Sequence, residues 1–385
     1  MSESTVAVIH IDNLKHNINE IKKCIDSTRT RLLMPVKADA YGHGSLICAR
    51  IAQEEGIDFL SIARVSEARV LRENGITLPI LLFSLCDPEE VKEAIDLKIT
   101  PFVYDREYID LFAEECRKRN LKDYPVHLAV DSGMGRIGCY REEAAGLASY
   151  INETGRLKLE GMCTHFAVSD AKDSKSNAFT EKQFAYFSEA IQNVRNAGIN
   201  PGICHCANSA ATLDRKEMHL DMVRPGIIYY GYYPDEVNAG YLERQDKDIV
   251  LKPVMSLETK VCSIRKFTKG QSVGYGRTWT ASTDTDIAVL PIGYGDGLLR
   301  RFAQKGLNVS INGKEYPVVG RICMDQCMVD IGKDSGIKRW DKAIIFGDIS
   351  KGASQTAEAL AESASTISYE ITTEIASRVP RIPVL

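Results

Sequence analysis

Apolar residues recur over the first 230 positions of the chain in short runs, at intervals of roughly 20 to 40 residues. Between the runs, apolar residues follow helical spacing, for example at 108–119 and 181–197. Continuous apolar runs of this length are typical of strands buried on both faces of a parallel sheet. The eight runs lie at 32–38, 57–63, 79–84, 100–104, 126–131, 159–166, 203–208 and 222–230.

Eight strand–helix units within about 200 to 250 residues are what a (β/α)₈ barrel of the TIM type requires. We therefore predict an α/β fold in which residues 10–250 form such a barrel. Active groups of these barrels follow the carboxyl ends of the strands. Functional residues are expected just after the apolar runs.

Near residue 251 the pattern changes to alternating apolar and polar positions that are interrupted by turn residues. Asn312-Gly313 lies between two such stretches and is a strong signal for a β-hairpin. Residues 251–385 are predicted to form a β-rich C-terminal domain, with one helix at 354–363. The expected strands are 287–292, 308–311, 315–319, 328–331 and 343–346.

The 385 residues carry a net charge of −4, so the chain offers no basic field for nucleic acid or an anionic membrane. Its start lacks the basic and apolar regions of a signal peptide, and no apolar run approaches the roughly 20 residues that span a bilayer. We expect a soluble, cytoplasmic protein whose partners are small molecules.

The eleven cysteines are an odd number, and many lie inside apolar runs, so reduced thiols are expected. Cys204-His205-Cys206, together with Cys323 and Cys327, raises the alternative of a metal site. Strand alternation places His205 on the opposite face from its two neighbours. We therefore predict no metal.

Lys37 follows an apolar run and precedes Tyr41-Gly42-His43-Gly44. A lysine at the end of a buried strand points into a closed mouth, where burial lowers the amine pKa and suits a Schiff base to an aldehyde cofactor or a general base. The alternative is a surface lysine that extends its charge into water. The tyrosine hydroxyl and the glycines favour a reactive lysine over a surface lysine, because they let a phosphate or a flat ring approach the backbone.

The segment 133–138 fits the G-x-G-x-x-G pattern of a dinucleotide-binding turn and follows a predicted strand. The acidic residue expected at the end of the next strand is missing, because Glu160 stands near that strand's beginning. The eight-unit pattern also disagrees with a doubly wound sheet. A dinucleotide site is therefore not predicted here.

The segment 34–44 resembles the pyridoxal-phosphate lysine segment of alanine racemases, and further matches run almost to the last residue. The resemblance implies that the cofactor is pyridoxal 5'-phosphate, that Lys37 forms the Schiff base and that Tyr41 lies at the cofactor. It also assigns a strand near the N-terminus, within residues 1–9, to the C-terminal domain.

Three basic residues match racemase positions around the cofactor ring. The resemblance implies that Arg136 donates to the cofactor's phenolate oxygen and helps to hold the substrate carboxylate, although the local sequence also fits a surface arginine. It places His165 between Arg224 and the catalytic tyrosine as a hydrogen-bonding group. Arg224 would face the pyridine nitrogen and, as a permanent cation, leave it unprotonated, which disfavours decarboxylase chemistry.

The last two barrel runs lead into loops where TIM barrels often bind phosphate. Ser209 supplies a hydroxyl, and Gly226 and Ile227 can supply backbone N–H groups. The resemblance adds Asn208 to the cofactor-binding residues, and Tyr369, which would reach the phosphate and restrict the pocket.

Racemisation requires an acid/base group on each face of a planar intermediate, so Lys37 cannot act alone. The segment around Tyr275 resembles the racemase segment that supplies the second base. The resemblance also implies that Met324 holds the substrate carboxylate through its N–H and that Tyr294 narrows the approach to the pocket. These three residues would come from a partner subunit, which predicts a homodimer with shared active sites. Taken alone, each also fits a packing or turn residue.

The predicted function is interconversion of L- and D-alanine, with Lys37 as the base for the D-enantiomer and Tyr275 as the base for the L-enantiomer. The resemblance further implies supply of D-alanine for peptidoglycan. The alternatives are a serine or broad-specificity racemase, since a methyl pocket rejects a hydroxyl only weakly, and a non-catalytic carrier of the cofactor. The second domain with Tyr275 and Met324 disfavours a carrier.

Ala129 departs from the family pattern. Many relatives carry a lysine at this position that becomes carbamylated and orients the arginine equivalent to Arg136. Alanine cannot form that carbamate, so we expect a small anion or a neighbouring polar side chain to take its place.

Overall fold

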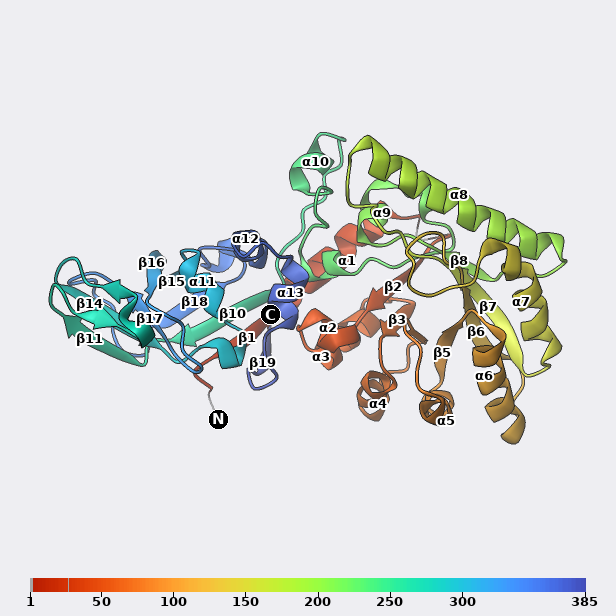
Figure 1. Ribbon diagram of the computed structural model, residues 1–385, viewed down its shortest axis with the longest axis horizontal. Helices are drawn as coiled ribbons and strands as arrows, with labels where there is room; N and C mark the ends of the chain where they lie inside the picture. Colours follow the sequence, from red (N-terminus) through yellow and green to blue (C-terminus); the bar gives the residue numbers. More distant parts are fainter. Residues whose placement is uncertain (1–2, 27) are drawn as a thin grey trace.

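The computed structural model of the protein describes residues 3–26 and 28–385. A barrel and a sheet-rich part lie next to each other along the long axis of the molecule (Figure 1). Eight strands form the barrel in the spatial order β8-β7-β6-β5-β4-β3-β2-β9, and the paired neighbours are parallel. The strands are β2 (Arg31–Pro35), β3 (Phe59–Ile62), β4 (Ile80–Leu82), β5 (Ile99–Val103), β6 (Tyr124–Ala129), β7 (Leu157–Cys163), β8 (Ile203–His205) and β9 (Met222–Val223).

The barrel closes between β8 and β9 by hydrogen bonds just outside the strands. The Asp221 N–H donates to the Cys204 carbonyl at 3.0 Å, and the Arg224 N–H donates to the Ala207 carbonyl at 2.8 Å. The predicted α/β barrel is therefore confirmed, and its carboxyl ends converge on one mouth.

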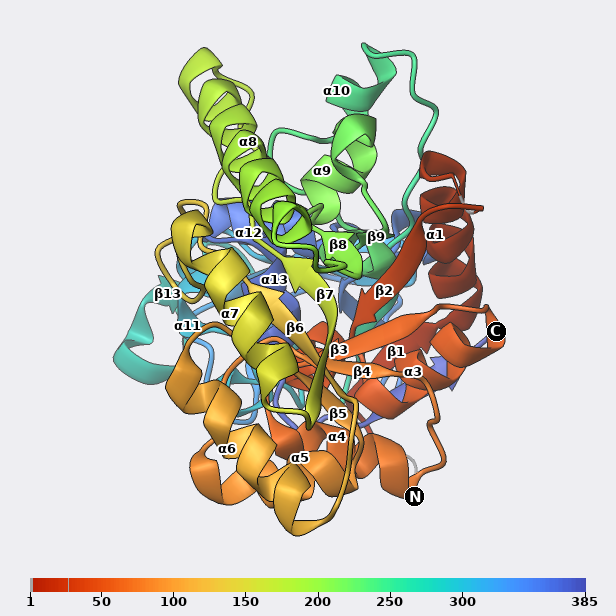
Figure 2. The ribbon, with the colours of Figure 1, turned by 90° about the vertical axis from the view of Figure 1, so that its right-hand side faces the viewer.

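Helices surround the strands, as Figure 2 shows for α5 to α8. The predicted helix at 108–119 corresponds to α6, and the one at 181–197 is the second part of α8, which begins earlier because the Asp173 side chain accepts from the N–H groups of Lys175 and Ser176. Among the helices in the described ranges, none is both long and apolar enough to cross a membrane. The barrel helices are α1 (Ile11–Cys24), α2 (Lys37–Tyr41), α3 (Ser45–Glu54), α4 (Val65–Glu73), α5 (Val91–Asp96), α6 (Arg106–Lys118), α7 (Arg141–Glu153), α8 (Ser174–Asn196), α9 (Ser209–Asp214) and α10 (Ala239–Glu243).

Several predicted strands were too long, and two of them lead into residues of the expected site. The run at 222–230 is a strand only to Val223, and the 3₁₀ helix η3 (Ile227–Tyr230) follows. Pro225 has no N–H to donate to a ladder, which ends the strand. The run at 32–38 ends as a strand at Pro35, and Lys37 begins the short segment α2.

The main sheet of the sheet-rich part has nine strands among the described residues, in the order β11-β14-β17-β16-β15-β18-β10-β1-β19, and β12 (Ser272–Val273) pairs separately with β13 (Trp279–Thr280). The N-terminal strand β1 (Val6–His10) pairs antiparallel with β10 and parallel with β19, so the first residues of the chain lie in the same sheet as its end. The remaining elements include β10 (Met255–Lys260), β11 (Ser263–Phe267), η4 (Tyr275–Arg277), β14 (Thr285–Leu290), β15 (Asn308–Ile311), β16 (Lys314–Val319), β17 (Cys327–Asp330), β18 (Lys342–Phe346), α12 (Ala357–Ser363), α13 (Ser368–Thr373) and β19 (Arg381–Val384).

The predicted hairpin is present between β15 and β16. Ile311 pairs with Lys314, which leaves Asn312 and Gly313 as a two-residue turn. Their φ angles are 51° and 75°. Positive φ at both positions is the requirement of a type I′ turn, which this dipeptide meets at low cost.

The barrel interior is closed by side chains from almost every strand. Seven buried apolar residues form a cluster of their own, apart from the larger core between strands and helices: Leu33, Phe59, Leu81, Phe102, Ala129, Cys163 and Met222. Strand β8 contributes the buried His205 and β6 also contributes His127.

Candidate active site

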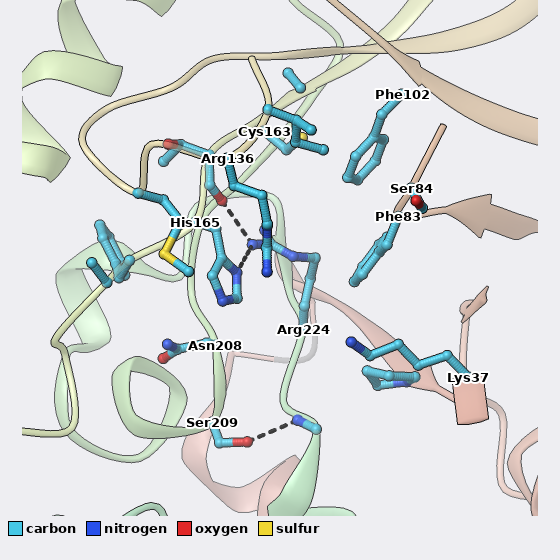
Figure 3. Close-up of a pocket in the computed structure, with 18 of the residues that line it drawn as sticks. Lys37, Phe83, Ser84, Phe102, Arg136, Cys163, His165, Asn208, Ser209 and Arg224 are labelled. Carbon is cyan, nitrogen blue, oxygen red and sulfur yellow. Dashed lines mark hydrogen bonds between the residues drawn. The ribbon is translucent and has the colours of Figure 1, made fainter. Parts of the chain in front are cut away.

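A cavity of about 490 Å³ opens at the carboxyl ends of the barrel strands. Figure 3 shows Lys37, Arg136, His165 and Arg224 reaching toward one space from different strand ends. The residues singled out in the sequence that line this cavity are Lys37, Tyr41, Arg136, His165, Asn208, Ser209, Arg224, Gly226 and Tyr369.

Lys37 begins a left-handed turn. Four residues in succession, Ala38 to Tyr41, have φ between 51° and 55°, a conformation that costs non-glycine residues free energy and is found where structure over-determines it. The Glu67 carboxylate holds the start of the turn, since it accepts the Ala38 N–H at 2.6 Å, and Asp39 accepts the Ser45 N–H at 2.7 Å. The turn fixes Lys37 at the cavity wall.

The surroundings of Lys37 lower the pKa of its amine. Burial lowers the pKa of Lys37, the neighbouring Arg136 lowers it further, and Glu67 raises it. A lowered amine pKa suits a nucleophile or a proton acceptor. The sequence expectation for this lysine rested on burial, and the structure adds the charge of Arg136.

Tyr41 joins the barrel to the C-terminal part of the chain. Its ring centroid lies 5.1 Å from that of Tyr230 and 5.7 Å from that of Tyr369, which stands on α13. A Cβ atom on Gly226 would lie 2.8 Å from the Tyr41 hydroxyl. The absence of a side chain at position 226 therefore leaves room for that hydroxyl.

Ser209 and Asn208 tie the loops of this corner together. The Ser209 Oγ accepts the Gly226 N–H at 2.8 Å (Figure 3). The Asn208 side-chain oxygen accepts the Ala211 N–H at 3.1 Å as the cap of α9, and the Ser169 hydroxyl at 2.9 Å. Hydroxyls of Tyr41 and Ser209 and the backbone at Gly226 thus meet in one polar corner.

Arg224 is buried at 6% exposure, and its hydrogen-bond partners are all neutral. Its guanidinium donates to His205 Nδ1 at 2.8 Å, the Thr164 carbonyl at 2.7 Å and His165 Nδ1 at 3.3 Å. Burial lowers the pKa of Arg224, but an arginine stays protonated in proteins. The site therefore holds a fixed, uncompensated cation.

Apolar residues surround Ala129. It belongs to the cluster that includes Phe102 and Cys163, with the half-buried Phe83 and Ile137 packed against it. Phe83 and Phe102 stack with ring centroids 5.1 Å apart, and the Arg224 guanidinium lies 5.8 Å from the Phe83 ring centroid. What takes the place of the absent lysine beside Arg136 stays a prediction.

Sequence reasoning missed His127 and treated His205 only as a metal candidate. Both imidazoles are fully buried, and His205 contacts Arg224 directly. Cys204 and Cys206 turn away from it and donate to the backbone carbonyls of Gly202 and Met218. The available signal was strand alternation, which points His127 and His205 inward from strands β6 and β8.

Four residues of the expected site do not line this cavity. Ile227 is buried beside Gly226. Tyr275, Tyr294 and Met324 belong to the sheet-rich part, and their exposed fractions are 71%, 40% and 54%. The site of a single chain therefore lacks them.

The positive charge of the cavity indicates the kind of ligand that it binds. In the described ranges, no carboxylate forms an ion pair with Lys37, Arg136 or Arg224, and the Asp131 carboxylate at the rim accepts backbone N–H groups of Gly133 and Gly135. A barrel with a reactive lysine and converging cations is built for an anionic small molecule. The fold and the site are those of a barrel enzyme.

Comparison with known proteins identifies the family. Residues 9–234 match the model of the alanine racemase N-terminal domain, and residues 254–383 match that of the C-terminal domain. The alanine racemase of Treponema denticola is 47% identical over 381 residues, covering 98% of both chains. The chain belongs to the alanine racemase family.

Solved structures agree with this assignment. The alanine racemase of Clostridium difficile 630 superposes with a TM-score of 0.92 at 38% identity, covering 100% of this chain and 96% of that one. That of Bacillus anthracis, solved with bound L-Ala-P, gives a TM-score of 0.90 at 34% identity, covering 100% and 96%.

Proposed function

We propose that the protein is an alanine racemase that interconverts L- and D-alanine with pyridoxal 5'-phosphate. The observation that carries the proposal is the placement of Lys37 in a strained strand-end turn, facing a cavity with Arg136 and Arg224 and no carboxylate partner for either arginine among the described residues. The names of its relatives, which match over nearly the whole chain, support the same activity.

The residues of the cavity fit this cofactor. The polar corner of Tyr41, Ser209 and Gly226 offers hydroxyls and backbone to a phosphate. Arg224 is a donor that cannot accept a proton, so it would hold a pyridine nitrogen in its unprotonated form. Arg136 is positioned to meet anionic oxygens. When bound, the cofactor supplies the electron sink that makes the substrate α-proton acidic.

Lys37 would hold and move the proton on one face of the α-carbon. Burial lowers its pKa, which favours the amine as a proton acceptor. The opposite face requires a second group, for which we propose Tyr275 of a second copy of the chain.

We propose a homodimer with shared active sites. Tyr275, Tyr294 and Met324 are large, exposed side chains on the sheet-rich part. They lie outside the cavity of their own chain, so their proposed roles as second base, pocket restriction and N–H donor to the substrate carboxylate require a second copy. The resemblance also supports a cytoplasmic role in supplying D-alanine for peptidoglycan.

The first test concerns Lys37. Borohydride treatment of the protein with bound cofactor should fix the cofactor to Lys37, as shown by mass spectrometry of the labelled peptide. Lys37→Ala should abolish both the label and racemisation. Fixation on a different lysine would contradict the proposed site, and the absence of turnover in a labelled protein would favour a non-catalytic carrier.

The second test concerns direction and substrate. Tyr275→Phe should slow racemisation both ways, since the equilibrium between enantiomers cannot change, and solvent deuterium should still enter D-alanine without inversion. Equal loss of exchange from both enantiomers would argue against two bases. Chiral analysis of a panel of L-amino acids decides between alanine and the serine or broad-specificity alternative, which remains because a small pocket rejects a hydroxyl weakly.

A further inference from the structure

A chain of polar side chains runs from the cavity through the barrel interior. Arg224 Nη1 lies 2.8 Å from His205 Nδ1, and His205 Nε2 lies 2.8 Å from His127 Nδ1. His127 Nε2 lies 3.4 Å from Glu160 Oε2, a charge contact that does not have the geometry of a hydrogen bond. The two histidines are fully buried, whereas the Glu160 side chain is 33% exposed. The chain thus links the cation of the site to a carboxylate near the solvent.

The donor and acceptor chemistry of these groups fixes the position of every proton. Arginine only donates, so His205 Nδ1 must accept and His205 carries its proton on Nε2. That proton is donated to His127 Nδ1, which leaves the proton of His127 on Nε2, facing the Glu160 carboxylate. A carboxylate only accepts, so both ends of the chain impose the same direction.

An irregularity in the pairing of two strands places Glu160 next to His127. The pairing of β6 with β7 shifts register between Val126 and His127, so that Val126 pairs with Leu159 and His127 pairs with Gly161. Glu160 is the extra residue of this bulge, and bulges re-aim side chains. A Cβ on Gly161 would lie 2.7 Å from His127 Nδ1 and 2.5 Å from the Ile203 carbonyl oxygen. A residue larger than glycine would displace the His127 ring.

We propose that Glu160 is a positioning residue that acts through His127 and His205 to hold the Arg224 guanidinium in one orientation. Without the carboxylate of Glu160, the buried His127 Nε2 proton loses its only recorded anionic neighbour among the described residues, and the opposite tautomer becomes favourable for His127. With that tautomer, every hydrogen bond in the series runs in the opposite direction. An N–H of His205 would then face the N–H of Arg224. The carboxylate prevents this conflict.

The charge states agree with this arrangement. Burial lowers the pKa of His127 and the Arg224 cation lowers it too, while Glu160 opposes both. The pKa of His205 is lowered well below its ordinary value by burial and by Arg224. The neighbouring His127 lowers the pKa of Glu160. At neutral pH, two neutral imidazoles therefore lie between the Arg224 cation and the Glu160 anion.

The tautomers can be measured without cofactor or substrate. Nitrogen-15 NMR of histidine-labelled protein, assigned with His127→Gln and His205→Gln variants, should show both imidazoles neutral with the proton on Nε2. Glu160→Gln should keep this pattern because an amide oxygen still accepts. Glu160→Ala should give His127 a mixture of tautomers. A protonated ring or an Nδ1 proton in the unmodified protein would overturn the assignment, as would an unchanged His127 in Glu160→Ala.

The effect on the site rests on the proposed function and is measured separately. Titration with pyridoxal 5'-phosphate should show about tenfold weaker binding to Glu160→Ala, corresponding to one buried N–H that faces no acceptor, and nearly unchanged binding to Glu160→Gln. Glu153→Ala, at the exposed end of α7, is the matched control. Equal affinity of Glu160→Ala and Glu153→Ala would overturn the positioning role. Failure of the unmodified protein to bind would instead overturn the proposed function, with the tautomers still decided by NMR.

Discussion

The Arg224 guanidinium donates a hydrogen bond to Nδ1 of His165 across 3.3 Å. Because arginine cannot accept, the His165 ring must carry its own proton on Nε2 and present an N–H donor elsewhere in the cavity that it lines. Burial lowers the pKa of His165 to about 3, and Arg224, Arg136 and Lys37 contribute to the decrease. His165 is therefore a neutral donor at physiological pH.

The buried neutral histidines predict that the protein loses stability in mild acid. Burial lowers the pKa of His43 to about 4 and that of His165 to about 3, whereas an unfolded histidine titrates near 6.5. Between these values the unfolded chain binds more protons, so the free energy of unfolding falls as pH falls below 6.5. Each histidine should cost about 1.4 kcal/mol between pH 7.5 and pH 5.5.

Urea unfolding at the two pH values measures this loss. His43→Phe can keep the stacking on Tyr230, whose ring centroid is 4.5 Å away, but cannot titrate. Its stability should therefore depend less on pH than that of the unmodified protein. An identical pH dependence of the two proteins would contradict the assignment of a lowered His43 pKa.

Gly226→Ala should disturb the polar corner through Tyr41. The new Cβ would lie 2.8 Å from the Tyr41 hydroxyl and must push it away. We expect roughly tenfold weaker binding of pyridoxal 5'-phosphate, corresponding to about 1.4 kcal/mol. Tyr41→Phe removes the obstructing hydroxyl, so Gly226→Ala should cost less affinity in that background. A double-mutant cycle measures the difference, and strict additivity would count against this contact.

Two variants that are each impaired at a different base should restore each other if the active site is shared. A Lys37→Ala chain carries an intact Tyr275, and a Tyr275→Phe chain carries an intact Lys37. A mixed dimer then contains one complete site, and random exchange should restore about a quarter of the unmodified activity. Subunits exchanged under mild denaturant and assayed after dialysis give the measurement. No recovery from verified mixed dimers would show that both groups act within one chain.

Because position 129 is an alanine, we predict that racemase activity does not depend on bicarbonate. An alanine cannot carry a carbamate, so we expect a small anion such as chloride, or a neighbouring polar side chain, to take its place beside Arg136. Activity in halide-free buffer should rise with chloride and should not respond to bicarbonate. Ala129→Lys should reverse both responses. A bicarbonate requirement in the unmodified protein would contradict the prediction.

Local patterns in the sequence were sufficient to predict the barrel and the β-rich C-terminal part. Eight apolar runs separated by helical spacing have few solutions other than a parallel barrel, because each run must be buried on both faces. Asn312-Gly313 predicted its hairpin because only a few residues adopt two positive φ angles cheaply. Most of the expected cavity residues follow strand ends, where the topology alone brings them to one mouth.

Sequence alone did not reveal where strands stop or which buried polar groups meet. The left-handed turn after Lys37 is held by Glu67, which comes from another strand–helix unit. His127 and His205 are 78 positions apart and become partners only when the barrel closes. The bulge that aims Glu160 depends on the pairing of two complete strands. Periodicity determined the fold because burial is a local pattern, whereas these hydrogen bonds depend on distances that only the assembled barrel sets.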